Sequence, residues 1–105
     1  MRGGYTEAEV QKAIVGAARA TGWHVTIFST DRQGRRQHRS VPDLYLTHQG
    51  QQRQIWIECK AHGKWARDDQ IEWINRVNQA GGEAYICDSL ETAWAHLQKR
   101  RKGDR

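Results

Sequence analysis

The fold is decided by residues 41–60, which read VPDLYLTHQGQQRQIWIECK. Two largely apolar segments, residues 41–47 and 54–60, flank a polar turn at residues 49–52. Aromatic, β-branched and leucine residues on either side of a glycine-containing polar turn are typical of a β-hairpin. We therefore predict two antiparallel strands over these two segments.

The turn also predicts which residues face each other. An even-length turn centred between Gly50 and Gln51 pairs residues whose numbers sum to 101, so that Asp43 faces Glu58. Like charges that face each other on adjacent strands destabilise a sheet. A hard divalent cation compensates for this repulsion, since Mg²⁺ takes one or two carboxylates and keeps several waters. The acidic pair therefore indicates a divalent-cation site.

The face that carries Glu58 has a second charged residue and a tryptophan. Lys60 lies two positions after Glu58 and projects from the same face, whereas Ile57 and Cys59 project toward the core. A simpler interpretation of this face is a solvated surface with an ordinary salt bridge between Glu58 and Lys60. Trp56 shares the face and favours partial cover, which we expect the first helix to supply.

The rest of the chain predicts three helices and two further strands. A capping box at Thr6–Glu9 starts a helix whose apolar repeat continues until Gly22, and residues 23–28 alternate as a strand. A second helix begins with Asp68 or Asp69 as its cap and ends at Gly81-Gly82, and residues 84–87 form a short strand. Ser89 caps the last helix. The order αβββαβα predicts an α/β fold with one mixed four-stranded sheet flanked by helices.

The length of the chain indicates how many domains it forms, and its charge indicates what kind of partner it binds. A chain of 105 residues allows one domain, which we place at residues 1–105. Lys plus Arg exceed Asp plus Glu by 17 to 12, a net charge of +5 that favours a polyanion. The positive charge is concentrated in the loop at 29–40 and the tail at 98–105. These segments either contact phosphate groups or are simply solvated. The candidate DNA-binding residues are Arg32, Arg35, Arg36, Arg39, Lys64, Arg67, Lys99, Arg100 and Arg101.

Other classes of function lack support. No apolar run approaches the roughly 18 residues of a membrane span and no secretion signal is present, so we expect an intracellular, cytoplasmic protein with no membrane partner. Cys59 and Cys87 lie in apolar segments and are expected in the core. The histidines lack zinc-ligand spacing, and there is no phosphate-binding glycine loop. Trp65, beside Lys64, is expected either to stack on nucleic acid or to pack against the sheet edge.

Pro42-Asp43 followed by Glu58-Cys59-Lys60, on this order of elements, resembles the PD-(D/E)XK nuclease superfamily. Within it, the chain resembles the VRR-NUC domain from Glu7 to about Leu97, with Ser40 where a glycine commonly stands. The resemblance implies a restriction-endonuclease-like core and a Mg²⁺ or Mn²⁺ cofactor held by Asp43, Glu58, the Cys59 carbonyl and Glu7. The catalytic residues that it implies are Glu7, Asp43, Glu58, Lys60 and Gln70.

Two assignments stay open on the residues themselves. Glu9 has a structural role in the capping box, so Glu7 is the preferred acidic residue of the first helix, with Glu9 as the alternative. Gln70 is either a site residue or a solvated residue in the first turn of the second helix.

The resemblance also implies a function and its setting. It indicates a metal-dependent DNA endonuclease, selective for branched DNA such as Holliday junctions, that acts as a homodimer in DNA repair or phage replication. The small core of so short a chain also favours burial in a dimer. We expect it near the nucleoid of a bacterial or phage-infected cell. The alternatives are a catalytically silent DNA-binding or assembly module and a restriction-type, sequence-specific nuclease.

Overall fold

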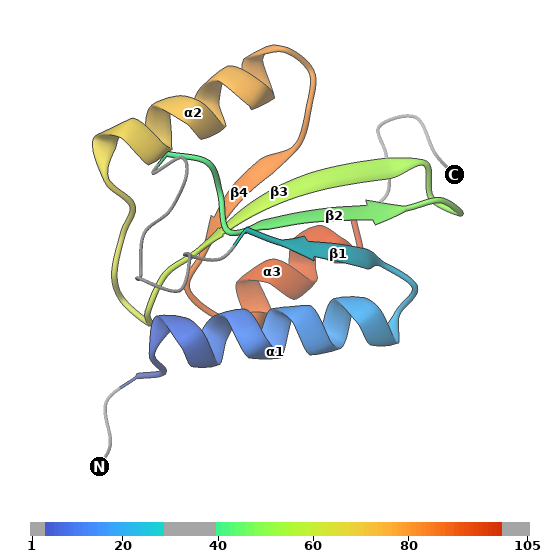
Figure 1. The fold of residues 1–105 in the computed structure, drawn as a ribbon, viewed down its shortest axis with the longest axis horizontal. Coiled ribbons are helices and arrows are strands. Elements are labelled where there is room, and N and C mark those ends of the chain that lie inside the picture. Colours follow the sequence, from blue (N-terminus) through green and yellow to red (C-terminus); the bar gives the residue numbers. More distant parts are fainter. Residues whose placement is uncertain (1–3, 29–39, 100–105) are drawn as a thin grey trace.

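The computed structural model describes residues 4–28 and 40–99, and within them the chain forms the predicted αβββαβα order (Figure 1). The four strands make one sheet in the order β1-β2-β3-β4. The strands β1 and β2 pair antiparallel, as do β2 and β3, and β4 pairs in parallel with β3. The α/β class and the mixed four-stranded sheet are therefore confirmed. The elements are α1 (Glu7–Ala20), β1 (His24–Ile27), β2 (Leu44–His48), β3 (Arg53–Cys59), α2 (Asp68–Gln79), β4 (Ala84–Cys87) and α3 (Leu90–Leu97).

The hairpin register is confirmed. The five β2–β3 pairs run from Leu44 opposite Ile57 to His48 opposite Arg53, and each pair of numbers sums to 101. The expectation that β2 begins at Val41 is wrong, because the strand begins only at Leu44. Asp43 lies one position before the strand, where its carbonyl accepts a hydrogen bond from the Phe28 N–H at 2.8 Å.

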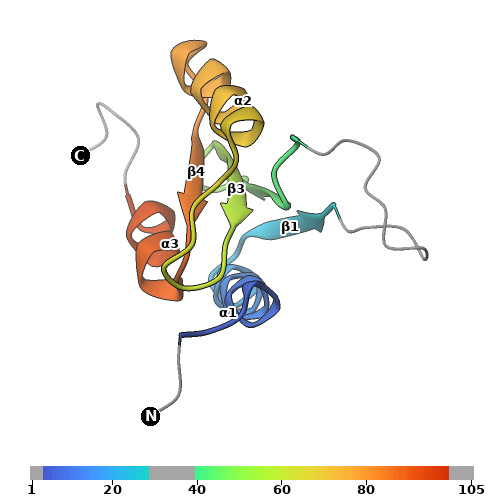
Figure 2. The same ribbon diagram turned by 90° about the vertical axis from the view of Figure 1, so that its left-hand side faces the viewer.

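Helices cover both faces of the sheet. Figure 2 shows α1 and α3 on one face and α2 on the other. The hydrophobic core lies on the first face, where Ile14 and Ala18 of α1 and Leu97 of α3 pack with Leu46 and Ile57 of the sheet. The second face is covered by α2, whose Trp73 contacts Trp56 with ring centroids 5.0 Å apart.

The expectation that the first helix covers the Glu58 face is wrong. The apolar stripe of α1 packs against the face that carries Ile57 and Cys59, so the alternation of β3 places Trp56 and Glu58 on the opposite face. It is α2 that reaches this opposite face, through Trp73. The side chains of the acidic site therefore lie between the sheet and α2.

Local signals place the helix ends. Thr6 and Glu9 form the predicted capping box at the start of α1. The second helix has Arg67 as its cap, one residue before Asp68 and two before Asp69, the two caps that the sequence predicted. It ends at Gln79, two positions before Gly81, which has a φ of 92° that favours glycine. The Gly82 N–H closes the turn on the Val77 carbonyl at 2.9 Å. Ser89 caps α3 by accepting the Thr92 N–H.

The two cysteines are core residues, as predicted. Cys59 and Cys87 are fully buried free thiols that lie opposite each other on β3 and β4. Burial, with a smaller effect of Asp88, raises the pKa of the Cys87 thiol to about 12. Within residues 4–28 and 40–99, no helix combines the length and apolar character that a membrane crossing needs.

Candidate active site

Four of the predicted site residues lie around the C-terminal end of β3. Asp43 precedes β2, Glu58 lies in β3, Lys60 follows it, and Gln70 lies in the first turn of α2. The hairpin register places Asp43 next to Glu58, and the chain from β3 into α2 returns Gln70 to the same face. The hairpin register and the return of the chain from β3 into α2 therefore bring these four residues together.

Glu58 is the centre of this arrangement. It is 1% exposed, and its Oε2 accepts a hydrogen bond from Gln70 Nε2 at 2.9 Å. The Lys60 Nζ lies 3.3 Å from the same oxygen, on a side chain that is 12% exposed. The other oxygen, Oε1, is buried as well. Because a buried carboxylate is costly unless it is paired, these contacts offset the cost of burying Glu58 and fix the orientation of its side chain.

Asp43 is held against the same strand. It is 5% exposed, and its Oδ2 accepts the backbone N–H of Cys59 at 2.8 Å. This contact ties Asp43 to the residue directly after Glu58. The structure thus places two buried carboxyl side chains at the ends of two neighbouring strands, with Lys60 beside Glu58.

The oxygen atoms at this position are suitable ligands for a hard cation. Two carboxylates and a backbone carbonyl are oxygen ligands of the kind that Mg²⁺ takes, and Mg²⁺ completes its shell with water. Across the described ranges, no three or more His, Cys, Asp or Glu residues gather into a group that could hold a metal ion. The candidate ligands therefore amount to an acidic pair.

The structure does not bring Glu7 into a three-carboxylate group with this pair. Glu7 is exposed in the first turn of α1. Glu9 accepts the Thr6 N–H at 2.8 Å and donates its own N–H to Thr6 Oγ1 at 3.2 Å, as a capping residue should. The start of α1 nevertheless lies beside the segment that follows Lys60, because the His62 N–H bonds the Tyr5 carbonyl at 2.9 Å.

Gln70 is not a solvated residue of the helix surface. It is 2% exposed, and both the oxygen and the nitrogen of its side-chain amide form hydrogen bonds. The Oε1 accepts the backbone N–H of Arg67 at 3.0 Å, while Nε2 donates to Glu58. Gln70 thus links the N-terminus of α2 to the acidic pair.

Three of the nine predicted DNA-binding residues, Lys64, Arg67 and Lys99, lie in the described part of the chain. Lys64 is exposed in the segment between β3 and α2, and Arg67 bonds Asp69, with Nε 3.1 Å from Oδ1. Lys99 lies at the end of the described chain, where its Nζ stands 5.5 Å from the Tyr85 ring centroid. The remaining candidates, Arg32, Arg35, Arg36, Arg39, Arg100 and Arg101, lie outside the described residues.

An aromatic cluster beside the acidic pair was not predicted. Trp56 lies 4.5 Å from Tyr45, 5.0 Å from Trp73 and 5.8 Å from Phe28, measured between ring centroids. Tyr45 and Trp56 are the cross-strand pair next to Asp43 and Glu58 on the same face. Strand parity could have identified that pair, but the contributions of Phe28 and Trp73 depend on the tertiary fold.

Comparisons with known proteins agree with the fold and with the family resemblance. The family described as "VRR-NUC domain" matches residues 3–91. A solved structure described as "VRR_NUC domain" superposes with a TM-score of 0.72, at 19% sequence identity, over 92% of this chain and 99% of that chain. No curated protein matches.

Proposed function

The chain belongs to the VRR-NUC domain family, and from this premise we propose that it is a metal-dependent nuclease that hydrolyses phosphodiester bonds in DNA. The observation that carries the proposal is the buried Glu58 carboxylate, held by Lys60 and Gln70, beside Asp43 on the neighbouring strand. An ordinary solvated strand face does not bury its acidic residues in this way.

Asp43 and Glu58 would hold Mg²⁺ or Mn²⁺, with the Cys59 carbonyl and Glu7 as further ligands. When bound, such an ion supplies Lewis-acid polarisation of a phosphate oxygen and a water of lowered pKa. Gln70 and the Cys59 N–H keep the two carboxyl groups in place before substrate arrives, so that the site is preorganised.

Lys60 is the residue that acts on the reacting groups. Its ammonium group, fixed beside Glu58, would orient the attacking water and offset the negative charge that grows on the phosphate. Water adds to phosphorus and gives up one proton, the bond to one nucleotide oxygen breaks, and that leaving oxygen takes up one proton, so that the products are a phosphate end and a hydroxyl end. A surface salt bridge would contribute nothing to such a step.

The substrate we propose is branched DNA, including four-way (Holliday) junctions, cut by a homodimer. The net charge of +5 supports a polyanionic substrate. Lys64, Arg67 and Lys99, together with the arginines of the 29–40 loop and the tail, would contact the phosphate backbone. Two active sites in one dimer would cut two strands of a junction. We expect the protein to work inside the cell, with DNA.

The test is a cleavage assay on end-labelled junction, flap and linear duplex in Mg²⁺, Mn²⁺ and EDTA. The parent protein should cut the branched substrates only in the presence of a divalent cation. Asp43→Asn and Lys60→Ala should bind but not cut. If both variants cut as fast as the parent, the site is wrong.

The same assay separates the two alternatives. Binding of DNA without any turnover by the parent would identify a catalytically silent DNA-binding or assembly module. Cleavage of random-sequence duplex at one recurrent sequence would identify a restriction-type nuclease. Sedimentation of the free protein and of its junction complex tests the homodimer.

A further inference from the structure

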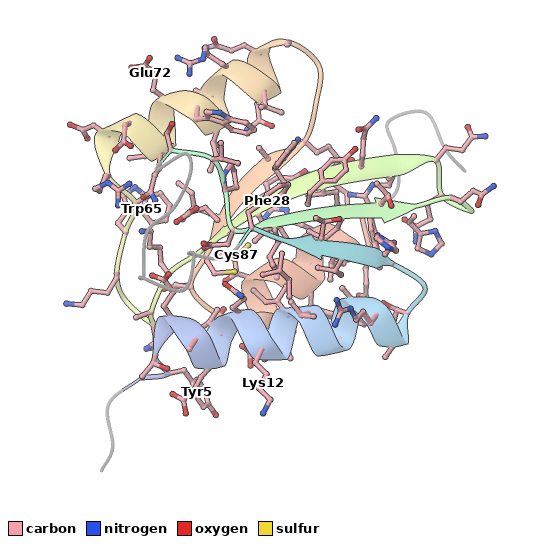
Figure 3. All side chains as sticks on the ribbon, in the orientation of Figure 1. Tyr5, Lys12, Phe28, Trp65, Glu72 and Cys87 are labelled. Carbon is pink, nitrogen blue, oxygen red and sulfur yellow. The ribbon has the colours of Figure 1, made fainter. Side chains whose placement is uncertain are left out.

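Trp65 is the most exposed large hydrophobic side chain in the described part of the chain. It is 67% exposed, in the segment that joins β3 to α2 (Figure 3). An indole normally contributes to stability by burying 150–250 Å² of surface. The expectation that this tryptophan packs against the sheet edge is therefore wrong.

The other four tryptophans of the sequence all have a packing role. Trp23 is buried in the core, Trp94 packs against it, and Trp56 and Trp73 pack against each other. Trp65 takes part in none of this packing. Its side chain is thus available to a ligand rather than committed to the fold.

The backbone around Trp65 is held in place. The Gly63 N–H bonds Asp88 Oδ2 at 3.0 Å, and the Lys64 N–H bonds the Ala61 carbonyl at 2.9 Å. On the other side, the Arg67 carbonyl accepts the Ile71 N–H in the first turn of α2 at 3.0 Å. An exposed ring on a fixed backbone loses little conformational freedom when it binds, as a preorganised contact requires.

The segment that carries Trp65 also connects the two residues that contact Glu58. Trp65 is five positions after Lys60 and five before Gln70, the two residues that contact Glu58 Oε2. Lys64 directly precedes the tryptophan and Arg67 follows it by two positions, so the segment carries a cationic residue before and after Trp65 in the sequence. An aromatic face combined with nearby cations is the composition of surfaces that bind single-stranded nucleic acid.

We propose that Trp65 stacks on an unpaired base of the DNA beside the acidic site, and so favours substrates with unpaired nucleotides over continuous duplex. The inference rests on the proposed function, and it adds how that site recognises a branch. Bases inside a duplex already stack on each other, so only an unpaired base offers a free face to the indole.

The experiment measures binding by fluorescence anisotropy with a forked DNA and a fully paired duplex of the same sequence. All proteins carry Asp43→Asn, which prevents cleavage during the titration. Trp65→Ala should weaken fork binding by about 5-fold to 100-fold, the range expected when one base stack is removed. Duplex binding should change by less than about 2-fold on the same scale.

Two substitutions of Trp65 serve as matched controls. Trp65→Phe keeps an aromatic face and should retain most of the fork preference. Trp65→Leu keeps apolar surface without that face and should behave like Trp65→Ala. Equal losses on fork and duplex, no loss at all, or full rescue by leucine would overturn the proposal, and leucine rescue would indicate an apolar contact with a protein or a second copy.

Cleavage by proteins with the natural Asp43 separates this inference from the nuclease proposal. If the parent cuts and the Trp65 variants bind fork as the parent does, only the stacking proposal fails. If nothing cuts but Trp65→Ala selectively loses fork binding, the nuclease proposal fails and stacking stands. Circular dichroism should give the same unfolding temperature for every Trp65 variant, because the side chain is exposed.

Discussion

Glu58 shows how one residue is prepared for chemistry by its neighbours. A buried carboxylate left without partners would take up a proton or destabilise the fold. Lys60 and Gln70 both approach its Oε2, so the residue stays oriented inside the protein. This orientation is the feature of the site that an ordinary surface ion pair lacks, and Lys60 is the partner that we expect to take part in the reaction.

Replacement of Lys60 by alanine should therefore lower the cleavage rate strongly. We expect a loss of about 10²-fold to 10³-fold, the usual effect of removing one group that stabilises charge in a transition state. The measurement is single-turnover cleavage of a labelled junction. Lys12→Ala, which removes an exposed lysine from α1 (Figure 3), is the matched control and should cut at the parent rate. Equal rates for the two variants would remove Lys60 from the mechanism.

Substitutions of Glu7 and Glu9 should distinguish a catalytic glutamate from a structural one. Glu9→Ala removes the acceptor of the Thr6 N–H and should lower the free energy of unfolding by about 1 kcal/mol, with little effect on cleavage. Glu7→Gln should slow cleavage with little effect on stability, because Glu7 is exposed. Thermal unfolding and cleavage rates check both effects. The reverse pattern would make Glu9 the residue of the site.

At the residue level, part of the site follows from local sequence. Asp43 opposite Glu58 could be predicted because a hairpin turn fixes its own register, and the observed strand pairs agree with it. Gln70 could be located on α2 but its contact with Glu58 could not, because that contact depends on how α2 packs on the sheet. Packing against the sheet edge is the more common fate of such a tryptophan and stacking on nucleic acid the alternative, and the sequence does not state which side chains the fold leaves uncovered.

At the level of elements, the sequence predicts the strands better than the helix positions. Alternation and turn residues predict β3 and its parallel partner β4, but the apolar stripe of α1 fits either face of the sheet. The structure places α1 and α3 on the face of Ile57 and leaves α2 to cover Trp56. The periodicity of a helix reports which side of the helix is buried, without reporting what buries it.

Three elements meet at a buried arginine that sequence patterns did not identify as structural. Arg53 of β3 makes two hydrogen bonds to Glu83, just before β4, at 3.0 and 2.7 Å. Its guanidinium also bonds the His96 carbonyl at 2.9 Å, near the end of α3. Partial burial alone raises the pKa of Glu83, but hydrogen bonds from Arg53 and Tyr85 and the charge of Arg53 outweigh it and hold that pKa below 4.5.

Loss of the Glu83 charge should therefore cost stability in a pH-dependent way. Because the folded-state pKa is lowered, the stabilisation is fully present above about pH 4.5 and disappears as the pH falls through the folded pKa. Glu83→Gln should lower the free energy of unfolding by about 2 kcal/mol at neutral pH and by progressively less in acid. Urea unfolding at a series of pH values measures this.

The matched control is Glu72→Gln. Glu72 pairs with Arg76 on the exposed face of α2, and such pairs contribute no more than about 0.5 kcal/mol. An equal effect of the two substitutions, or a Glu83→Gln effect that grows in acid, would contradict this role of Glu83.

At the level of the whole molecule, the basic segments should set the salt dependence of DNA binding. Replacing Arg32, Arg35, Arg36 and Arg39 by glutamine should make the plot of log K against log salt less steep, by about 0.9 for each phosphate that the protein no longer neutralises. Replacing Arg76, which pairs with Glu72 on α2, should leave the slope unchanged. A slope that is the same in both variants would place the DNA elsewhere.

The proposed nuclease activity requires Asp43 and Glu58 to act together as a cation site. Calorimetric titration of the parent and of Asp43→Asn with Mn²⁺ tests this most directly, since asparagine can still accept the Cys59 N–H while removing one negative charge. We predict that the parent takes up the ion and that Asp43→Asn loses most of this uptake while remaining folded. No uptake by the parent at millimolar Mn²⁺, or unchanged uptake by the variant, would contradict the account.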